Sequence, residues 1–418
     1  PMNYGCFSFV GRRDTNEDAE ICEQFMHDKH LYTLIAVFDG HCGDQASKYC
    51  KTNFQKVLKL QMTKNKDISL ALTQTFSQVD FDFQKKNNQA GTTACICLID
   101  NMTCEFWSAN TGDSRAIWFS QKFHQTADHK PEFEQERIMK AGGFVQKIGG
   151  IYKVIGQLGV SRAIGDKPFK KYGVISTPDI QIQQKVKFTV ICCDGVWDVF
   201  ESEEVCQMVC RCLKLESKLQ IPAQKQFLIQ AFVEYVNLNV EEGDQLIYSH
   251  VQIPYVPKNL PRVKEEMCQA ERMATTLVRM AYLLGSQDNL SAVVYVENPD
   301  ALVGALGRFS SQQFDIVEPL ISDEYLEEQI PSTLTVQPRP RFESFQVLEK
   351  EGETIIGGNS DQNGYNWENW ENEDNTKILQ LEAENMDLKK EKALMLQQIK
   401  TQNMLICQMQ EEISKLRQ

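Results

Sequence analysis

The stretch LIAVFDGH, Leu34–His41, joins an apolar run directly to an aspartate, a glycine and a histidine. The residues Leu31–Phe38 are rich in Ile, Val and Phe and predict a β-strand of the core. Asp39 therefore falls where this strand leaves the core. The stretch FTVICCDGVWD, Phe188–Asp198, repeats the arrangement and places Asp194 directly after a second apolar run. Two predicted core strands are thus each followed by an aspartate, and we expect the functional site at these strand ends.

Residues 1–298 alternate short β-type runs with helical stretches and are predicted to form one domain. The other predicted strands are Thr93–Ile99, Glu105–Ala109, Ser114–Phe119 and Ala292–Glu297. The predicted helices are Gln45–Leu60, Ser69–Lys86, Pro131–Ala141, Glu203–Lys214 and Val263–Leu284. The strands follow one another closely and the helices are grouped between them, which favours an α+β layered fold over strict βαβ alternation.

Acidic residues also occur in three short segments outside these two runs. GRRDTNEDA supplies Glu17 and Asp18, NTGDSRA holds Asp113 beside a glycine turn, and GSQDNLS places Asp288 just before the last strand. Carboxylates that converge at strand ends repel one another, and bound cations offset this repulsion. Ligation by oxygen alone, without His or Cys, selects hard ions such as Mg²⁺ or Mn²⁺ over zinc. The pattern therefore indicates a site for such ions.

Two hard cations can support phosphoryl transfer. When they lie ~3.5–4 Å apart, they lower the pKa of a bridging water and hold the oxygens of an in-line displacement. Arg13 is a candidate for binding the phosphate because its planar guanidinium contacts oxygens bidentately, and His41 is a candidate for protonating the leaving alkoxide. Each piece also has an ordinary interpretation, since Asp-Gly is most often a turn, Arg13 a solvated charge and His41 a structural hydrogen-bonding group. The occurrence of all these pieces together in one order favours a site for phosphoryl transfer over the ordinary interpretations.

In this order and spacing the segments resemble the metal-dependent type 2C protein serine/threonine phosphatases over about residues 3–298. The motifs that carry the resemblance are RRDTNEDA, FDGHCGDQAS, AGTTA, NTGDSRA, DHKP followed by ERIMKAGG, LGVSRAIGD, CCDGVWDV and GSQDNLS. The resemblance implies two antiparallel β-sheets packed face to face and flanked by helices, with the metal site at one end. It also implies hydrolysis of phosphoserine and phosphothreonine in phosphoprotein substrates by a hydroxide that bridges two metal ions.

The resemblance assigns metal-binding roles residue by residue. Asp39 is expected to bridge two Mg²⁺ or Mn²⁺ ions. Glu17 and the carbonyl of Gly40 are expected to complete one of the two sites, partly through water. Asp194 and Asp288 are expected to serve the other site. These assignments make the dimetal centre depend on four segments that lie far apart in the sequence.

The remaining assignments concern a third ion, the substrate and the metal-bound water. Asp113 matches a position that helps Asp194 to hold a third, weaker ion. Arg13 matches the residue that binds the phosphate, and His41 matches the general acid. Asp18 matches an acid that orients metal-bound water. Because every position holds the expected residue type, the motifs favour an active enzyme over a relative that has lost its metals.

Two segments depart from the pattern of the family. Between Asp166 and Pro178 the chain has only KPFKKYGVIST, where many relatives carry a longer flap beside the active site. The interval from Asp198 to Asp288 is, by contrast, longer than usual. Within it, Val240–Arg262 carries three prolines among aromatic and polar residues and is predicted to be an irregular inserted loop. This insertion is a candidate partner surface, with a plain solvent loop as the alternative.

The negative charge of the chain is concentrated in one segment. The whole chain has a net charge of −13, and Asp300–Asn375 alone holds 16 acidic and 4 basic residues, a balance of −12. The same segment contains several prolines and glycines, which is typical of a linker. We expect residues 299–375 to be an acidic linker or a segment that a partner orders.

Residues 376–418 are predicted to form a coiled-coil helix. A heptad register places an apolar residue at nine of the twelve a and d positions between 378 and 416, with Asn385 at one a position. At 1.5 Å per residue, a continuous helix here would be roughly 60 Å long. The pattern favours a parallel homodimer or pairing with another coiled-coil partner, and a single amphipathic helix packed on a protein is the alternative. The tail would then serve dimerisation or targeting.

Composition narrows the remaining classes of function. No basic stripe is present, which argues against nucleic acid as a ligand, and no apolar run reaches the ~20 residues that span a bilayer. No signal peptide is apparent, and the 14 cysteines lack zinc-type spacing, which favours free thiols in a reducing compartment. The expected location is cytoplasmic, either in solution or on a cytoskeletal or other large assembly. A structural component of such an assembly, with catalysis secondary, is the competing hypothesis.

Overall fold

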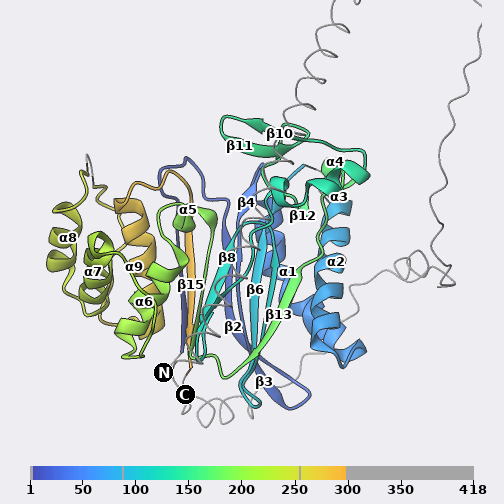
Figure 1. Cartoon of the computed structure of the whole chain (residues 1–418). Helices are drawn as coiled ribbons and strands as arrows, with labels where there is room; N and C mark the ends of the chain where they lie inside the picture. Colours follow the sequence, from blue (N-terminus) through green and yellow to red (C-terminus); the bar gives the residue numbers. More distant parts are fainter. Residues whose placement is uncertain (1–2, 87–88, 254–255, 298–418) are drawn as a thin grey trace, which may run out of the picture. The chain divides into compact units, whose positions relative to one another are not determined.

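The computed structural model describes residues 3–86, 89–253 and 256–297. These residues form an α+β structure built on two five-stranded β-sheets with helices outside them (Figure 1). The predicted fold class of the domain is therefore confirmed. The predicted acidic segment 299–375 and the predicted coiled coil 376–418 lie outside the described residues. Within the described residues, no helix is both long enough and apolar enough to cross a membrane.

Both sheets are antiparallel between all neighbouring strands. The first has the order β1 (Tyr4–Phe9), β15 (Leu290–Val296), β14 (Phe188–Cys192), β8 (Arg115–Phe119) and β9 (Phe123–Gln125). The second has the order β13 (Asp179–Gln184), β7 (Glu105–Thr111), β6 (Ala94–Asp100), β3 (His30–Phe38) and β2 (Ala19–His27). Because β1 pairs with β15, both ends of the domain meet in the first sheet.

Helices cover the outer face of each sheet (Figure 1). The second sheet is covered by α1 (Gln45–Lys64) and α2 (Ile68–Lys86). The first sheet is covered by α6 (Ser202–Cys212), α7 (Gln226–Val236), α8 (Val240–Tyr248) and α9 (Gln269–Leu283). The strands of the middle layers are consequently buried on two sides.

This layering explains the uninterrupted apolar sequence of β3. Ile35 and Val37 pack into the core between the two sheets, in one cluster with Ile191 of β14. Leu34 and Phe38 point to the opposite face, into the cluster that the sheet forms with α1 and α2. A strand alternates its side chains with a period of two residues. Since both faces of β3 are covered, both sets are apolar.

Part of the inserted segment is helical, contrary to the prediction of an irregular loop at Val240–Arg262. Its first nine residues form α8, with Glu241 and Glu242 in the first turn, where acidic side chains favour a helix start. Ile247 of α8 is fully buried in the core cluster that also contains α7. The prolines that suggested a loop all follow residue 253, so they do not interrupt the helix.

Two helix boundaries also differ from the prediction. α9 begins at Gln269 and not near Val263, because Cys268 is its N-cap and the thiol accepts a hydrogen bond from the backbone N–H of Glu271. The predicted helix at Pro131–Ala141 is divided into a 3₁₀ turn, η1 (Pro131–Phe133), and the short helix α3 (Gln135–Lys140).

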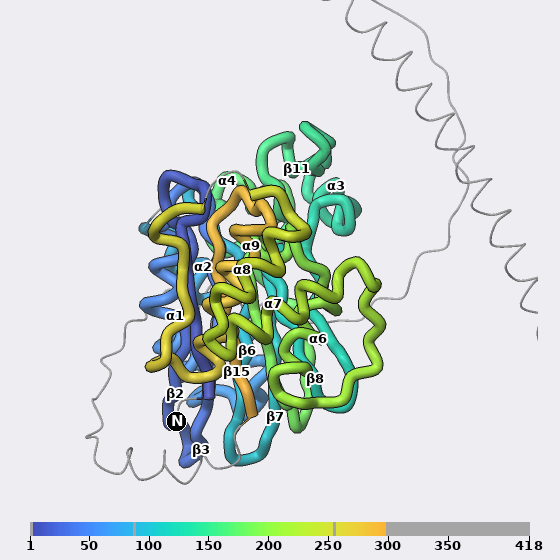
Figure 2. The backbone as a smooth tube through the Cα atoms, turned by 90° about the vertical axis from the view of Figure 1, so that its left-hand side faces the viewer, coloured from blue at the N-terminus to red at the C-terminus, as the bar shows by residue number. Residues whose placement is uncertain are grey.

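A small unit lies at one end of the sheets, at the top of Figure 1. It contains α3, the hairpin β10 (Val145–Ile148) and β11 (Ile151–Val154), and α4 (Lys167–Lys170), and Figure 2 shows α3 and β11 at the same end from the side. Ile138, Val154, Leu158 and Val174 form its separate apolar core. Three short strands, β12 (Ile164–Gly165), β5 (Gly91–Thr92) and β4 (Gly40–His41), form a sheet of their own beside it.

Candidate active site

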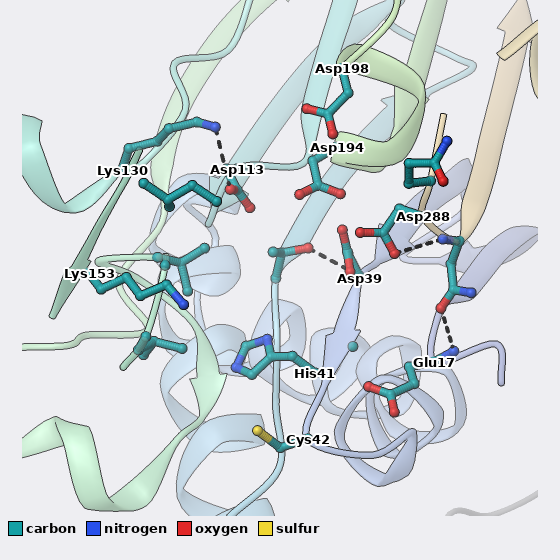
Figure 3. Close-up of a pocket in the computed structure, with 18 of the residues that line it drawn as sticks. Glu17, Asp39, His41, Cys42, Asp113, Lys130, Lys153, Asp194, Asp198 and Asp288 are labelled. Carbon is teal, nitrogen blue, oxygen red and sulfur yellow. Dashed lines mark hydrogen bonds and ion pairs between the residues drawn. The ribbon is translucent and has the colours of Figure 1, made fainter. Parts of the chain in front are cut away.

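Several strand ends converge below this small unit. Asp39 follows β3, Asp113 follows β7, and Asp288 lies just before β15. Asp194 is the first residue of α5 (Asp194–Trp197), a one-turn helix that follows β14. Figure 3 shows these carboxyl groups turned toward a common space, and Glu17 lines the same cavity, which has a volume of about 1010 Å³.

The structure therefore brings together the five acidic residues that the sequence suggested as direct metal ligands. Gly40 and His41 line the same cavity, and so does Arg13. Asp18 lies deeper and is only 7% exposed. The short segment 167–177, which the sequence analysis compared with a flap, forms α4 and the turn after it. The residues that stand over the cavity come instead from β11 and the loop up to residue 160.

Two threonines hold the backbone of Asp39. The N–H of Thr93 donates to the carbonyl of Asp39 over 2.9 Å, and the N–H of Asp39 donates to the hydroxyl of Thr93 over 3.1 Å. The hydroxyl of Thr92 donates to the same carbonyl over 3.0 Å. Both hydroxyls therefore act on the main chain that carries Asp39.

Glycine is required where segments of the site approach one another most closely. A Cβ atom on Gly40 would overlap the carbonyl oxygen of Glu17. A Cβ atom on Gly91 would overlap the side chains of both His41 and Asp166. These two positions explain the glycines of the FDGH and AGTTA motifs, since a side chain at position 40 would displace the backbone of Glu17 and one at position 91 would displace His41 and Asp166.

Asn289 links the two ends of the domain at the site and was not predicted. Its amide nitrogen donates to the carbonyls of Val10 and Thr15, and its amide oxygen accepts from the backbone N–H of Glu17 over 2.9 Å. Its own backbone N–H donates to Asp288 over 2.7 Å. One side chain thus fixes the loop before Glu17 against the segment that carries Asp288. The signal was its place in the GSQDNLS motif.

The surroundings of the carboxyl groups in the site disfavour their ionised form. Burial, together with the charges of nearby aspartates, raises the pKa of Asp39 well above its ordinary value. Burial also raises the pKa of Asp18 and of Asp113, each to about 7. Burial and the charge of Asp288 also raise the pKa of Asp194. A cation bound among these carboxyl groups would offset their repulsion.

The donor atoms around this space fit a hard divalent cation. Asp18 and Asp39 lie close enough to Cys193 for the three residues to contact one ion, but the thiol of Cys193 is engaged elsewhere. It donates to the carbonyl of Asn289 and accepts from the N–H of Ser291, and burial raises its pKa. The thiol is therefore neutral, while Oδ1 of Asp18 is buried without a hydrogen-bond partner. Oxygen ligands of this kind suit Mg²⁺ or Mn²⁺.

Two cationic side chains already contact the acidic cluster. Nη2 of Arg13 lies 2.6 Å from Oδ2 of Asp288, and the Arg13 side chain is 58% exposed at the rim of the cavity. Nζ of Lys130 lies 3.8 Å from Oδ2 of Asp113 (Figure 3). Arg13 was predicted from the sequence, whereas Lys130 was not, although Lys130 stands in the DHKP motif.

His41 has a carboxylate partner, Asp166, that was not predicted from the sequence. Its Nε2 lies 2.7 Å from Oδ2 of Asp166, whose side chain is 1% exposed. Burial acts to lower the pKa of His41, but the hydrogen bond and charge of Asp166 outweigh it and raise the pKa above the ordinary value. Asp166 adopts a left-handed backbone conformation, with φ of 50°. Asp166 thus favours the protonated form of the His41 ring, which lines the cavity.

Comparison with known proteins agrees with this geometry. Residues 2–232 match the family model of protein phosphatase 2C, which is more than half of the chain. The chain belongs to the protein phosphatase 2C family. A probable protein phosphatase 2C from Paramecium tetraurelia is 32% identical in an alignment that covers 54% of this chain and 84% of that protein. Protein phosphatase 2C homolog 1 of Saccharomyces cerevisiae is 30% identical over 47% of this chain and 77% of its own length.

Other family members are longer than the shared region. Probable protein phosphatase 2C 71 of Arabidopsis thaliana is 35% identical over 219 residues, which cover half of this chain and 48% of that protein. Among solved structures, a sex-determining protein of C. elegans aligns with a TM-score of 0.52 at 23% identity, over 73% of this chain and 67% of its own. A phosphatase from Toxoplasma gondii aligns with a TM-score of 0.50 at 20% identity, over 71% and 92%. These two structures support the fold.

Proposed function

We propose that this member of the protein phosphatase 2C family hydrolyses phosphoserine and phosphothreonine in proteins with the help of Mg²⁺ or Mn²⁺. The observation that carries the proposal is the convergence of five carboxyl groups, from Glu17, Asp39, Asp113, Asp194 and Asp288, on one cavity. Family membership supports the reaction class, and the raised pKa of Asp39 supports a bound cation.

Each acidic residue has a proposed place around two ions. Asp39 would contact both ions, with Glu17 and the carbonyl of Gly40 on one side. Asp194 and Asp288 would contact the ion on the other side. Bound there, the ions would activate water for attack on phosphorus and neutralise the charge that develops on the phosphoryl oxygens.

The other proposed roles complete the acidic set. Asp113, with Asp194, would hold a third and weaker ion. Asp18 would accept hydrogen bonds from water at the dimetal centre through its unpartnered Oδ1, while its Oδ2 accepts from the hydroxyl of Ser291 over 2.7 Å. A carboxylate held on one side in this way has a fixed orientation toward the cavity, which suits a water-orienting role.

Two basic residues act on the substrate in this proposal. Arg13 lies at the rim, where its guanidinium would exchange its contact with Asp288 for the phosphate, because the planar group binds two oxygens at once. His41 would donate its proton to the oxygen of the leaving serine or threonine. Asp166 would keep the ring protonated and oriented until that transfer occurs.

Hydrolysis of a phosphothreonine peptide by the full chain tests the reaction and its metal dependence. We expect turnover with Mg²⁺ or Mn²⁺, its loss with EDTA, and its recovery when either ion is added back in excess. Robust turnover in EDTA would contradict the dimetal proposal. No turnover with any divalent ion, from a protein that circular dichroism shows to be folded, would contradict the phosphatase proposal itself.

The role of His41 is tested by the leaving group. A general acid matters most when the leaving group is a poor one, such as the alkoxide of serine, and least for p-nitrophenolate. The variant His41→Gln should therefore lose roughly 10²-fold or more of its kcat on the phosphopeptide and much less on p-nitrophenyl phosphate. Equal losses on both substrates would place His41 in binding or folding and not in proton transfer.

Residues 298–418, the tail, lie outside the described residues, so its interpretation rests on the sequence alone. We propose that it mediates dimerisation or targeting and that the protein acts in the cytoplasm, on its own or on a larger assembly. A chain ending at residue 298 should then retain peptide turnover and lose self-association, as measured by light scattering. A collapse of turnover would make the tail part of the catalytic unit.

A further inference from the structure

The hairpin over the cavity has a surface that the proposed reaction does not use. β11 begins directly after the turn Gly149–Gly150, and Ile151, Tyr152 and Lys153 of this strand line the same cavity as the acidic residues. Both glycines of the turn have positive φ angles, 60° and 89°, which is the conformation that a two-residue hairpin turn needs. The hairpin thus places one strand along the mouth of the site.

The outer half of this strand is apolar and exposed. Ile151 is 59% exposed and Tyr152 is 37% exposed, whereas Val154 at the end of the strand is completely buried in the core of the small unit. The Cγ2 atom of Ile151 lies over Gly159, 4.0 Å from the position that a Cβ atom would occupy there. The buried end anchors the strand, while the apolar end faces solvent at the entrance.

Lys153 brings a positive charge to the same strand. Figure 3 shows its side chain extending from the hairpin toward the space between Asp113 and His41. The other two cavity cations each contact an acidic residue, Arg13 with Asp288 and Lys130 with Asp113. Lys153 takes part in none of the ion pairs found among the described residues. Its charge is available for an anion that enters the cavity.

We propose that β11 is the surface that selects the substrate, with Ile151 and Tyr152 binding a bulky apolar side chain next to the phosphorylated residue and Lys153 contacting the phosphate. The inference rests on the proposed phosphatase function and names the kind of phosphoprotein segment that this site prefers. The preferred substrate is an extended segment in which a residue such as Leu neighbours the phosphothreonine or phosphoserine.

The geometry of the cavity places a substrate residue next to the phosphorylated one against this apolar surface. The cavity of about 1010 Å³ is at the upper end of the size of pockets that enclose a drug-sized ligand, so it holds more than one phosphorylated side chain. Consecutive Cα atoms of a substrate are only ~3.8 Å apart. When the phosphate reaches Asp39, the neighbouring residues must therefore still lie at the mouth, beside Ile151. Covering this apolar surface with an apolar side chain is favourable.

The test uses two phosphothreonine peptides of the same sequence except for the neighbouring residue, Leu in one and Ser in the other. We expect the wild-type chain to prefer the Leu peptide, and Ile151→Ser to lower kcat/KM for that peptide roughly tenfold relative to the Ser peptide. Lys153→Gln should lower kcat/KM for both peptides by the same factor, because both carry the phosphate. The readout is the ratio of the two kcat/KM values for each protein.

Ile182→Ser is a matched control. Ile182 is also 59% exposed and also lies on a strand, β13, but it does not line the cavity. This variant should keep the wild-type ratio. An unchanged ratio in Ile151→Ser, or no preference in the wild-type chain, would overturn the inference while leaving the phosphatase function intact. An equal loss on both peptides and on p-nitrophenyl phosphate would also overturn it, since Ile151 would then act on the catalytic centre.

Discussion

Two groups of acidic residues near the end of the sheets differ in what surrounds them. Asp39 lies among other aspartates, so burial and repulsion both raise its pKa. Glu134, at the start of the small unit, is also partly buried, and burial acts to raise its pKa. Hydrogen bonds from Arg162 and Ser161 outweigh that effect and lower the pKa of Glu134 to about 2.

The partnered acids form a continuous chain of contacts from the small unit to the site. Arg162 bonds Glu134 through Nε and Nη2 and donates through Nη1 to Asp179 over 2.7 Å. Asp179 contacts Nε2 of His129 over 3.1 Å. The backbone N–H of His129 donates to the carbonyl of Gly112, and the backbone N–H of Gly112 donates to Nδ1 of His129. Gly112 is the residue before Asp113. Glu134 and Asp179, which pair with Arg162, thus hold the framework, whereas Asp39 lies among carboxyl groups that raise its pKa.

The largest effect is expected where an acid without a partner is removed. Asp39→Asn should lower kcat/KM by roughly 10³-fold or more, since a shared metal ligand is lost and several kcal/mol of transition-state stabilisation go with it. The melting temperature in EDTA should not fall, because one member of a repelling set becomes neutral. Steady-state kinetics and thermal unfolding measure the two quantities.

A control for this change is Asp28→Asn. Asp28 is 88% exposed in the turn between β2 and β3 and has a φ of 46°, a conformation that asparagine tolerates. It should keep wild-type activity. If Asp39→Asn retains activity within tenfold of wild type, or melts well below it in EDTA, the acids of the site contribute to the framework, and the contrast with Glu134 fails.

A metal should stabilise the wild-type domain. A ligand present at 100 times its dissociation constant stabilises the folded state by about 2.7 kcal/mol, which corresponds to a rise of roughly 5–10 °C in melting temperature for a domain of this size. We expect this rise when Mg²⁺ or Mn²⁺ replaces EDTA, and a much smaller one in Asp39→Asn. Melting curves that are the same with and without metal in the wild type would contradict the proposed site.

The sequence predicted the central strands well because their environment is simple. β3, β6 and β14 are buried on both faces, so their apolar runs are uninterrupted. The strands of the two large sheets that were missed are β1, β2, β9 and β13, and two of them carry many polar residues: β13 reads DIQIQQ and β2 reads AEICEQFMH. They lie at or near the outer edges of the sheets, where one face meets solvent or a partly open layer. Such positions leave only a weak sequence signal.

Asp39, Asp113, Asp194 and Asp288 were predictable because each follows or precedes a recognisable strand, whereas Glu17 was predicted from the segment GRRDTNEDA. Their partners were not, because a partner depends on distances across the fold. Asp166 reaches His41 across 125 positions of the chain, and Asn289 reaches the backbone N–H of Glu17 across 272. The same holds for the hairpin: its sequence suggested nothing at the cavity, and only the fold of the small unit brings β11 there.

A smaller effect, on stability rather than chemistry, is expected for Glu134→Gln. The loss of its charge-assisted hydrogen bonds should cost about 2 kcal/mol at neutral pH. The folded-state pKa of about 2 lies below the ordinary 4.5, so the contribution is complete above pH 4.5 and disappears as the pH falls toward 2. The difference between wild type and variant, measured by denaturant unfolding, should therefore shrink below about pH 4.5. A difference that grows on acidification would contradict the assignment.

The smallest effect is expected two residues further on, at Glu136. Its carboxylate lies 2.6 Å from Nζ of Lys140, one helical turn away, and that hydrogen bond lowers its pKa, as the arginines do for Glu134. Both side chains are at least 75% exposed, however, so water and salt screen the pair. Glu136→Gln should leave the unfolding midpoint unchanged within error. If it destabilised the domain as much as Glu134→Gln does, the ion pair alone, and not its burial, would determine how much each acid contributes to stability. The proposed difference between the partly buried Glu134 and the exposed Glu136 would then be wrong.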